Sequence, residues 1–194
     1  RCIRRRHWPN KKGFLPVSHY GFDHFAAELE YLVPHSLHQQ DLVKKLVTPM
    51  QKLLSNEELL PGDFVSSLVD GHIDGRVYTS PEHSFFVQVF AWAPGSTTPI
   101  HDHKTWGLMG VYHNQLQITE FTIVPTPEPG VFSLHQKDRF QAGRGMIASV
   151  TCPDDEIHHV ENPSEHYSYS IHVYGAELDQ TDYFDIESGR FYRP

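Results

Sequence analysis

The sequence predicts a mainly β protein, a small barrel or sandwich of short strands with a helical segment before it. Apolar residues recur every three or four positions only in the first third of the chain. From about residue 76 the period changes to two, and candidate strands follow at intervals of about 8–12 residues. The 194 residues are 39% hydrophobic, which is enough for one domain with its own core.

The segment 18–63 is expected to form a helical cap. Phe25 and Leu29 belong to one apolar face with helical spacing, and residues 36–54 carry a second apolar stripe. Pro49 is expected to kink or end the second helix, because it lacks an N–H group and clashes with the preceding turn. The Pro-Gly pair at 61–62 is expected to be a breaker between the cap and the strands.

The β region is expected to span residues 76–194. A loop is predicted at 125–130, which contains three of the chain's prolines and a glycine. With no internal repeat, the whole chain 1–194 is interpreted as one domain, with residues 1–17 as a basic tail. The candidate strands are 85–92, 107–112, 116–124, 131–134, 146–151, 157–160 and 167–174.

The charge balance argues against a nucleic-acid or membrane protein. Sixteen Lys and Arg stand against 24 Asp and Glu, a formal net charge of −8. An acidic chain is a poor partner for phosphates, and no stretch of about 18 apolar residues could span a bilayer. Cys2 and Cys152 are the only cysteines, which excludes a disulfide scaffold and favours a reducing cytoplasm. The oligomeric state is not predicted.

Histidine is the unusual residue of the composition, with 15 copies. The most informative pair is His101 and His103, separated by Asp102. On a strand, residues i and i+2 point to the same face, so two imidazoles placed in this way can bind one metal ion. The alternative is a polar surface strand with two unrelated histidines.

Two segments resemble the two motifs of the cupin superfamily. Residues 95–103 read G-x5-H-x-H, and residues 153–162 read P-x-D-x2-H-x3-N, with Asp where the family usually has Gly. The resemblance implies a jelly-roll barrel that holds a metal between opposed strands. At the place of the family's glutamate ligand stand Gly107 and Leu108, and Glu120 is too far along the chain to replace it.

The expected ligands are therefore the neutral imidazoles of His101, His103 and His158. His159 competes for the third place, but the H-x3-N spacing to Asn162 favours His158. Adjacent strand residues face opposite sides, so only one of the two can be a ligand. Three neutral ligands leave a divalent ion its full charge, which favours an anionic thiolate substrate on iron. Zinc would fit three histidines equally well.

A second candidate constellation lies at residues 168–174. Ser170, His172 and Tyr174 share one face of the predicted strand. Such a face is costly in a dry core unless its polar groups bond each other, so we expect a chain from Ser170 through His172 to Tyr174, with the phenol directed at the metal. The alternative is an exposed strand with polar alternation. Trp92 and Trp106 could line the site, but aromatic strand residues more often belong to the core, which is the expectation for both.

Together, the segments 92–103 (WAPGSTTPIHDH), 157–162 (IHHVEN) and 170–174 (SIHVY) resemble the thiol dioxygenases of the cupin superfamily, the cysteine and 3-mercaptopropionate dioxygenases. The resemblance extends weakly over residues 76–175. It implies an enzyme that uses Fe(II) and O2 to convert a thiol to a sulfinic acid. It further implies that the three expected ligands bind iron, and that Ser170, His172 and Tyr174 form an outer triad.

The resemblance also carries differences. Residues 104–108 hold no cysteine, so the crosslink to the tyrosine known in mammalian cysteine dioxygenases is not expected on Tyr174. The cysteine enzymes have an arginine that binds the substrate carboxylate, and Arg76 aligns with it only after a shift of one residue. Alternatively, Arg76 is a surface residue. The mercaptopropionate enzymes have an arginine at the place of Tyr183.

The resulting hypothesis is a cytoplasmic Fe(II) dioxygenase for a small thiol carboxylate, with L-cysteine favoured over 3-mercaptopropionate. A non-enzymatic metal-binding cupin that senses or stores a ligand is one alternative. A zinc hydrolase that uses metal-bound water is another.

Overall fold

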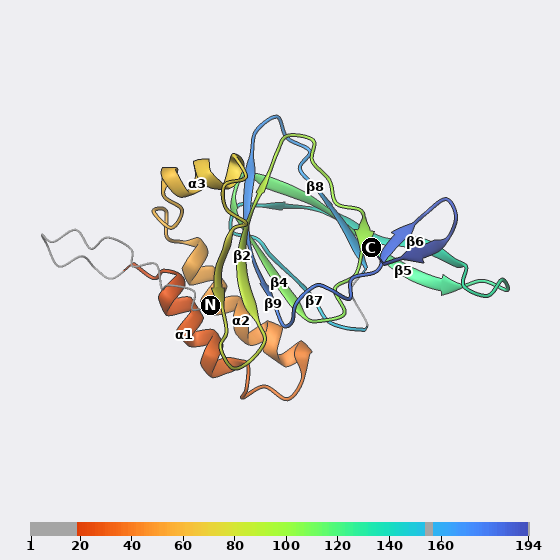
Figure 1. Ribbon diagram of the computed structural model, residues 1–194, viewed down its shortest axis with the longest axis horizontal. Helices are drawn as coiled ribbons and strands as arrows, with labels where there is room; N and C mark the ends of the chain where they lie inside the picture. The colour runs from red at the N-terminus through yellow and green to blue at the C-terminus, as the bar shows by residue number, and fades with distance from the viewer. Residues whose placement is uncertain (1–18, 154–156, 194) are drawn as a thin grey trace, which may run out of the picture.

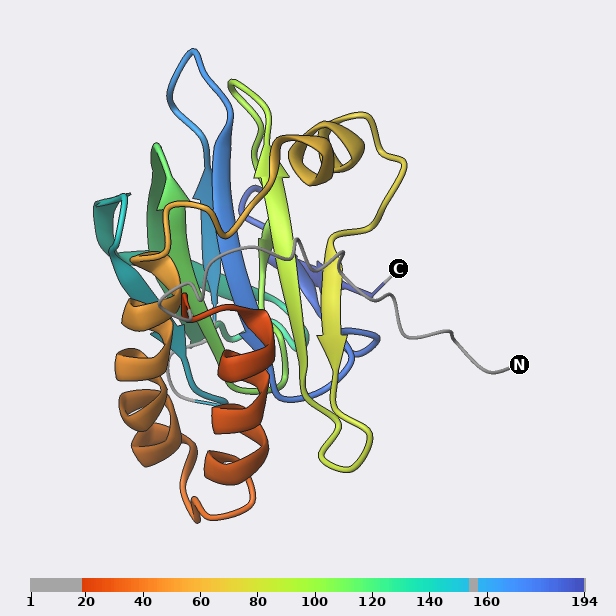
Figure 2. The same ribbon diagram turned by 90° about the vertical axis from the view of Figure 1, so that its left-hand side faces the viewer.

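The computed structural model describes residues 19–153 and 157–193, so the basic tail predicted for 1–17 lies outside the described residues. Two antiparallel sheets face each other, and helices cover the outer face of one of them (Figures 1 and 2). The mainly β class with an N-terminal helical segment is therefore confirmed. None of the helices in these ranges is long and apolar enough to cross a membrane.

The helical segment consists of α1 (Phe22–Leu32), α2 (Gln39–Leu54) and α3 (Gly62–Val69). Two expectations about where its prolines end helices are wrong. Pro49 lies inside α2, which continues to Leu54, because Met50 and Leu53 are fully buried and their packing outweighs the lost hydrogen bond. Pro61 is the residue before α3 rather than the end of the helical region, since proline is well suited to a helix start.

The first sheet lies against the helices and has the strand order β1-β2-β9-β4-β7. Helix α2 packs closely on β4, where the absence of a side chain at Gly110 leaves room for Met50 and Leu54. All strand pairs of this first sheet are antiparallel. The bounds are β1 Arg76–Thr79, β2 Phe86–Trp92, β9 Ser168–Tyr174, β4 Gly107–His113 and β7 Ile147–Val150.

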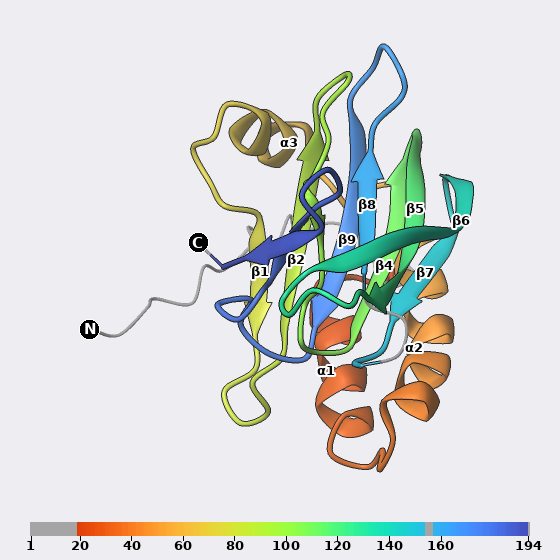
Figure 3. The ribbon, with the colours of Figure 1, turned by 90° about the vertical axis from the view of Figure 1, so that its right-hand side faces the viewer.

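The second sheet has the order β11-β10-β3-β8-β5-β6 and is seen in front in Figure 3. Neighbouring strands such as β3 and β8 are far apart in the sequence, which is the crossing pattern of a jelly roll. The hairpin β10–β11 was not among the predicted strands. The bounds are β3 Ile100–His101, β5 Gln115–Pro125, β6 Phe132–Gly143, β8 His158–Glu161, β10 Tyr183–Asp185 and β11 Arg190–Tyr192.

Strand β9 connects the two parts of the core. Ile171 and Val173 are fully buried in the cluster between the first sheet and the helices. The alternating residues Ser170, His172 and Tyr174 are also buried, but on the opposite face, between the sheets. Period-two alternation in this strand therefore places a row of polar side chains inside the molecule rather than on its surface.

Candidate metal centre

Three histidines meet between the sheets. His101 ends β3, His103 follows it, and His158 begins β8 directly opposite His101 in the antiparallel register. One ring nitrogen from each lies within 4.8 Å of the others, and the Nε2 atoms of His101 and His103 are 3.1 Å apart. The pairing of two strands more than fifty residues apart in the chain thus assembles a set of ligands that could hold a metal ion.

The protonation of these rings suits metal binding. Burial lowers the pKa of His101, and burial together with the neighbouring His158 and His101 holds the pKa of His103 well below its usual value. We assign the proton of His101 to Nδ1, which lies 2.9 Å from the Pro99 carbonyl and leaves the Nε2 lone pair directed at the cluster. Neutral imidazoles are the form that binds a metal.

The donor set fits a divalent transition metal. It consists of imidazole nitrogens alone, a combination that suits iron or zinc. His103 Nδ1 is buried and has no partner among the residues with described positions. The other ring nitrogen, Nε2, faces His101 Nε2 at 3.1 Å, so His103 is directed into the histidine cluster by the nitrogen that has a neighbour there.

His159 points away from this cluster. Its Nδ1 lies 2.8 Å from the Thr98 carbonyl, and its Nε2 lies 3.2 Å from the Thr97 hydroxyl and 3.8 Å from a Glu161 carboxylate oxygen. Adjacent residues of a strand face opposite sides, so β8 brings only His158 to the inside.

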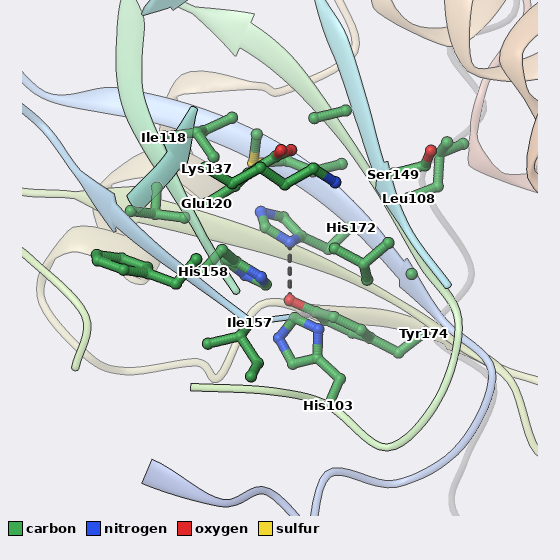
Figure 4. Close-up of a pocket in the computed structure, with 16 residues that line it drawn as sticks. His103, Leu108, Ile118, Glu120, Lys137, Ser149, Ile157, His158, His172 and Tyr174 are labelled. Atoms are coloured by element: carbon green, nitrogen blue, oxygen red, sulfur yellow. Dashed lines mark hydrogen bonds between the residues drawn. The ribbon is translucent and has the colours of Figure 1, made fainter. Parts of the chain in front are cut away.

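The side chains of Ser170, His172 and Tyr174 form a continuous hydrogen-bonded chain. Ser170 Oγ lies 2.8 Å from His172 Nε2. His172 Nδ1 lies 2.8 Å from the Tyr174 hydroxyl, the bond drawn as a dashed line in Figure 4. The chain reaches the three histidines, because the centroid of the Tyr174 ring is 4.8 Å from that of His103.

Trp92 extends this chain and determines its direction. Its indole N–H donates to Ser170 Oγ at 2.7 Å, and an indole can only donate. The fully buried Ser170 hydroxyl then has His172 Nε2 as the acceptor for its own proton. We therefore assign the ring proton of His172 to Nδ1, which donates to the Tyr174 oxygen and leaves the phenol proton free for the cavity.

Trp92 is thus not simply a core residue, as expected from its type, because it also lines the cavity beside the histidines. Trp106 does lie in the core, with 7% of its surface exposed. The indole bond to Ser170 joins residues 78 positions apart and depends on the pairing of β2 with β9. No local pattern in the sequence indicates it.

Burial keeps the two titratable groups of the chain, His172 and Tyr174, uncharged. It lowers the pKa of His172 to about 3, with a further contribution from His158 and His101, and it raises the pKa of the Tyr174 phenol. At neutral pH the chain therefore holds a neutral imidazole and a protonated phenol. Tyr174 can donate a hydrogen bond but does not act as an anion.

Two cavities adjoin the histidines. The larger, of about 200 Å³, is lined by all three and by Trp92, Tyr174 and residues of the C-terminal segment. The smaller, of about 50 Å³, touches His103 and His158 from the other side and is mostly apolar. The larger cavity is below the range typical of drug-sized ligands, so it suits a small molecule.

Glu120 comes closer to the cluster than its place in the sequence suggests. It pairs with His158 in the β5–β8 register and lines the smaller cavity together with Lys137 (Figure 4). Gly107 and Leu108 line the same cavity and supply no carboxylate. Glu120 was not expected near the metal site because it is far from His101 and His103 along the chain. The pairing of β5 with β8 nevertheless places it beside His158.

Arg76 lies on the same sheet face as the site but lines neither cavity. It pairs with Gln88 of β2, which in turn pairs with His172. Its guanidinium binds the Glu177 carboxylate through two hydrogen bonds of 2.6 and 3.0 Å and lies 3.9 Å from the centre of the Phe86 ring. Its predicted contact with a substrate carboxylate stays a prediction.

Two buried aspartates, Asp102 and Asp182, form a charge network beside the histidine cluster. Asp102, 1% exposed, accepts a hydrogen bond from the Asp182 backbone N–H at 3.0 Å and contacts the Lys104 ammonium. Lys104 also lies 3.0 Å from a carboxylate oxygen of Asp182, and Arg193 binds the other oxygen at 2.8 Å. The residue between two candidate ligands is thereby tied to the C-terminal segment.

Comparison with known proteins gives a limited likeness. No family model matches the chain. Among solved structures, it is similar to an oxalate oxidase (17% identity over 50% of this chain and 45% of that one, TM-score 0.37). It is also similar to a cupin-superfamily sugar phosphate isomerase from Silicibacter pomeroyi (14% identity over 57% of this chain and 68% of that one, TM-score 0.39). A third similar structure is the Schizosaccharomyces pombe Cnp3 cupin domain (10% identity over 53% of this chain and 59% of that one, TM-score 0.38).

The chain thus spans less than half the length of the oxalate oxidase chain. The isomerase and the Cnp3 domain are named as cupins, and at such identities the chemistry of these neighbours is not transferred to this chain.

Proposed function

We propose that the protein is an Fe(II)-dependent dioxygenase of small thiols, with the overall reaction R–SH + O2 → R–SO2H. Both oxygen atoms are added to the sulfur, which is oxidised from thiol to sulfinic acid while O2 is reduced. The observation that carries the proposal is the meeting of a three-histidine cluster with the Trp92–Ser170–His172–Tyr174 chain in one cavity.

His101, His103 and His158 would hold the metal. Fe(II), when bound, supplies the one-electron chemistry that brings a thiolate and O2 to reaction. Because all three protein ligands are neutral, none of the ion's charge is offset by the chain, and an anionic thiolate is favoured over a neutral ligand. A carboxylate in the ligand set would weaken this preference.

Tyr174 is proposed to act as a hydrogen-bond donor to the reacting oxygen or to the substrate. Its oxygen accepts from His172 Nδ1, so its own proton is available to the cavity. The raised pKa of the phenol keeps that proton in place at neutral pH. Ser170 and His172 hold the direction of the donor, which would otherwise need to reorient during the reaction.

L-Cysteine is the first candidate substrate, and 3-mercaptopropionate is the second. Both are short enough for a cavity of about 200 Å³. Recognition of their carboxylate by Arg76 would require the guanidinium to exchange its Glu177 partner for the substrate. We assign this activity to a single domain spanning residues 1–194 that acts in a reducing cytoplasm without nucleic acid.

The test is oxygen uptake after anaerobic loading with Fe(II), with L-cysteine and 3-mercaptopropionate offered separately. We expect uptake equal to the sulfinate formed, and loss of most turnover in Tyr174→Phe at unchanged iron content. Absence of thiol-dependent uptake with either compound would refute the proposal. Metal analysis of protein as purified distinguishes a zinc hydrolase, which would carry zinc and work without oxygen.

A further inference from the structure

Asn162 ends the H-x3-N pattern of the sequence and is fully buried, but it lies outside the walls of both cavities. Its Nδ2 group donates to the carbonyls of Trp92 at 2.9 Å, Ala93 at 3.2 Å and His166 at 2.8 Å. Its Oδ1 atom accepts from the backbone N–H of Ser164 at 3.1 Å and from the hydroxyl of the same residue at 2.8 Å. The partners therefore determine the orientation of this amide.

These hydrogen bonds join strand ends from both sheets. Asn162 directly follows β8 of the second sheet, whereas Trp92 ends β2 and His166 lies just before β9 in the first sheet. The backbone of Asn162 adds two bonds to the loop after β2: its N–H donates to the Ser96 carbonyl at 2.9 Å, and its carbonyl accepts from the Gly95 N–H at 3.0 Å. The loops after β2 and β8 accordingly lie side by side at one end of the molecule (Figures 1 and 3).

The end of β2 that carries Trp92 is held by a neighbouring strand on one side. There β9 pairs with β2 as far as Trp92, which lies opposite Ser168. On the other side β1 pairs with β2 only as far as Gln88, and within the described chain no strand continues to Trp92 there. The bonds from Asn162 to this end of β2 supply a restraint that β1 does not provide.

The position of Trp92 matters to the site because its indole N–H determines the direction of the proton chain. The bond to Ser170 Oγ is 2.7 Å long, and a displacement of about 1 Å would take the donor out of hydrogen-bonding distance. Without the indole, the Ser170 hydroxyl could accept from His172 Nε2 instead of donating to it. Whatever fixes the end of β2 therefore also fixes the ring proton of His172.

We propose that Asn162 is a positioning residue that holds the end of β2 so that the Trp92 indole reaches Ser170. Through that bond it keeps the ring proton of His172 directed at the Tyr174 oxygen. The effect on turnover rests on the proposed dioxygenase function. The hydrogen bond of the indole, in contrast, is a property of the resting protein and is measured without any reaction.

The first test follows the indole N–H of Trp92 by NMR, in metal-free protein made with isotopically labelled tryptophan. The signal is identified by its absence from Trp92→Phe. In Asn162→Ser the shorter side chain cannot reach the three carbonyls. We expect exchange of the Trp92 indole proton with solvent to become about tenfold faster relative to that of Trp106, the effect of one hydrogen bond. Trp106 is the internal reference, because it lies in the core and general loosening would accelerate both.

The second test combines Asn162→Ser and Trp92→Phe in a double-mutant cycle on Fe(II)-loaded protein with L-cysteine. Each single change is expected to lower kcat about tenfold at nearly unchanged KM. The double variant should be no slower than either single one, because both changes remove the same bond. Zn(II) titration should give a wild-type Kd in Asn162→Ser, since β8 keeps its pairs with β3 and β5.

Asn114→Ser is the matched control. Asn114 binds the same loop before β9, through the Ser164 hydroxyl at 2.6 Å and the His166 carbonyl at 3.3 Å, but forms no bond to Trp92 in the described part of the chain. It should leave the indole exchange rates and kcat near wild type. If Asn162→Ser does not fold, Ser164→Ala replaces it, because the Ser164 hydroxyl orients the Asn162 amide. We then expect a smaller acceleration at Trp92.

Unchanged exchange at Trp92 in the variant that folds, or equal acceleration at Trp92 and Trp106, would overturn the inference. A double variant about ten times slower than either single one would also overturn it, because Asn162 would then act independently of Trp92. A loss of Zn(II) affinity in Asn162→Ser would assign it to the metal ligands instead. If exchange changes as expected but no thiol drives oxygen uptake, the proposed oxidation fails and the positioning role of Asn162 stands.

Discussion

Replacement of Asp102 by alanine tests whether the residue between the two candidate ligands holds the C-terminal segment in place. The carboxylate is 1% exposed and accepts the Asp182 N–H at 3.0 Å. A hydrogen bond to a buried charged group is worth about 1.5–3 kcal/mol. The contact with Lys104, whose side chain is 37% exposed, adds about 0.2–1 kcal/mol. Asp102→Ala should therefore destabilise the protein by about 2–4 kcal/mol.

The measurement is urea unfolding of metal-free protein, so that loss of a bound ion does not contribute. Asp102→Asn retains an acceptor for the Asp182 N–H and should cost only about 1 kcal/mol. Glu57→Ala, which removes a highly exposed ion pair with Arg144, should change stability by less than about 0.5 kcal/mol. Equal losses in Asp102→Ala and Asp102→Asn, or a loss no larger than that of Glu57→Ala, would refute the assigned role.

Two further predictions concern the site. His158→Ala should weaken metal binding by roughly 100-fold or more while His159→Ala leaves it near wild type, measured by metal titration, and the reverse would identify His159 as the ligand. Trp92→Phe should lower kcat about tenfold at unchanged metal affinity, because the His172 proton is no longer directed to Nδ1; unaltered kcat would contradict the assigned tautomer.

Burial raises the pKa of Asp182, but Lys104 and Arg193 outweigh this and hold it below its usual value of 3.8. The stability advantage of wild type over Asp182→Asn, about 1–2 kcal/mol, should therefore be complete at pH 5–7 and be lost only as pH falls below about 4. An advantage that persists at pH 2 in urea unfolding would contradict this reasoning.

Much of the architecture follows from local periodicity. Phe25 and Leu29, which have helical spacing, both belong to α1. The period-two pattern of residues 168–174 corresponds to β9. Failures of local reasoning occur where packing overrides propensity. Pro49 is tolerated inside α2 because the residues after it pack against the first sheet, and this contact is not visible in a local window.

The parts of the candidate site that depend on alternation along one strand were predictable from the sequence, and those that depend on the pairing of distant strands were not. His101 and His103 do meet, as alternation along a strand predicts, although β3 ends at His101 and His103 lies in the segment after it. The approach of Glu120 to His158, in contrast, is a consequence of strand register, and register is set by contacts far apart in the chain.

The sequence by itself determined the alternation of side chains, because alternation is a property of the extended backbone. It thereby grouped His101 with His103 and Ser170 with His172 and Tyr174. Only the tertiary structure decided that these two groups face each other between the sheets, that β8 brings His158 opposite His101, and that Trp92 orients the proton chain. The physical reason is that strand pairing depends on burial of apolar surface across the whole chain, whereas alternation depends only on neighbouring bonds.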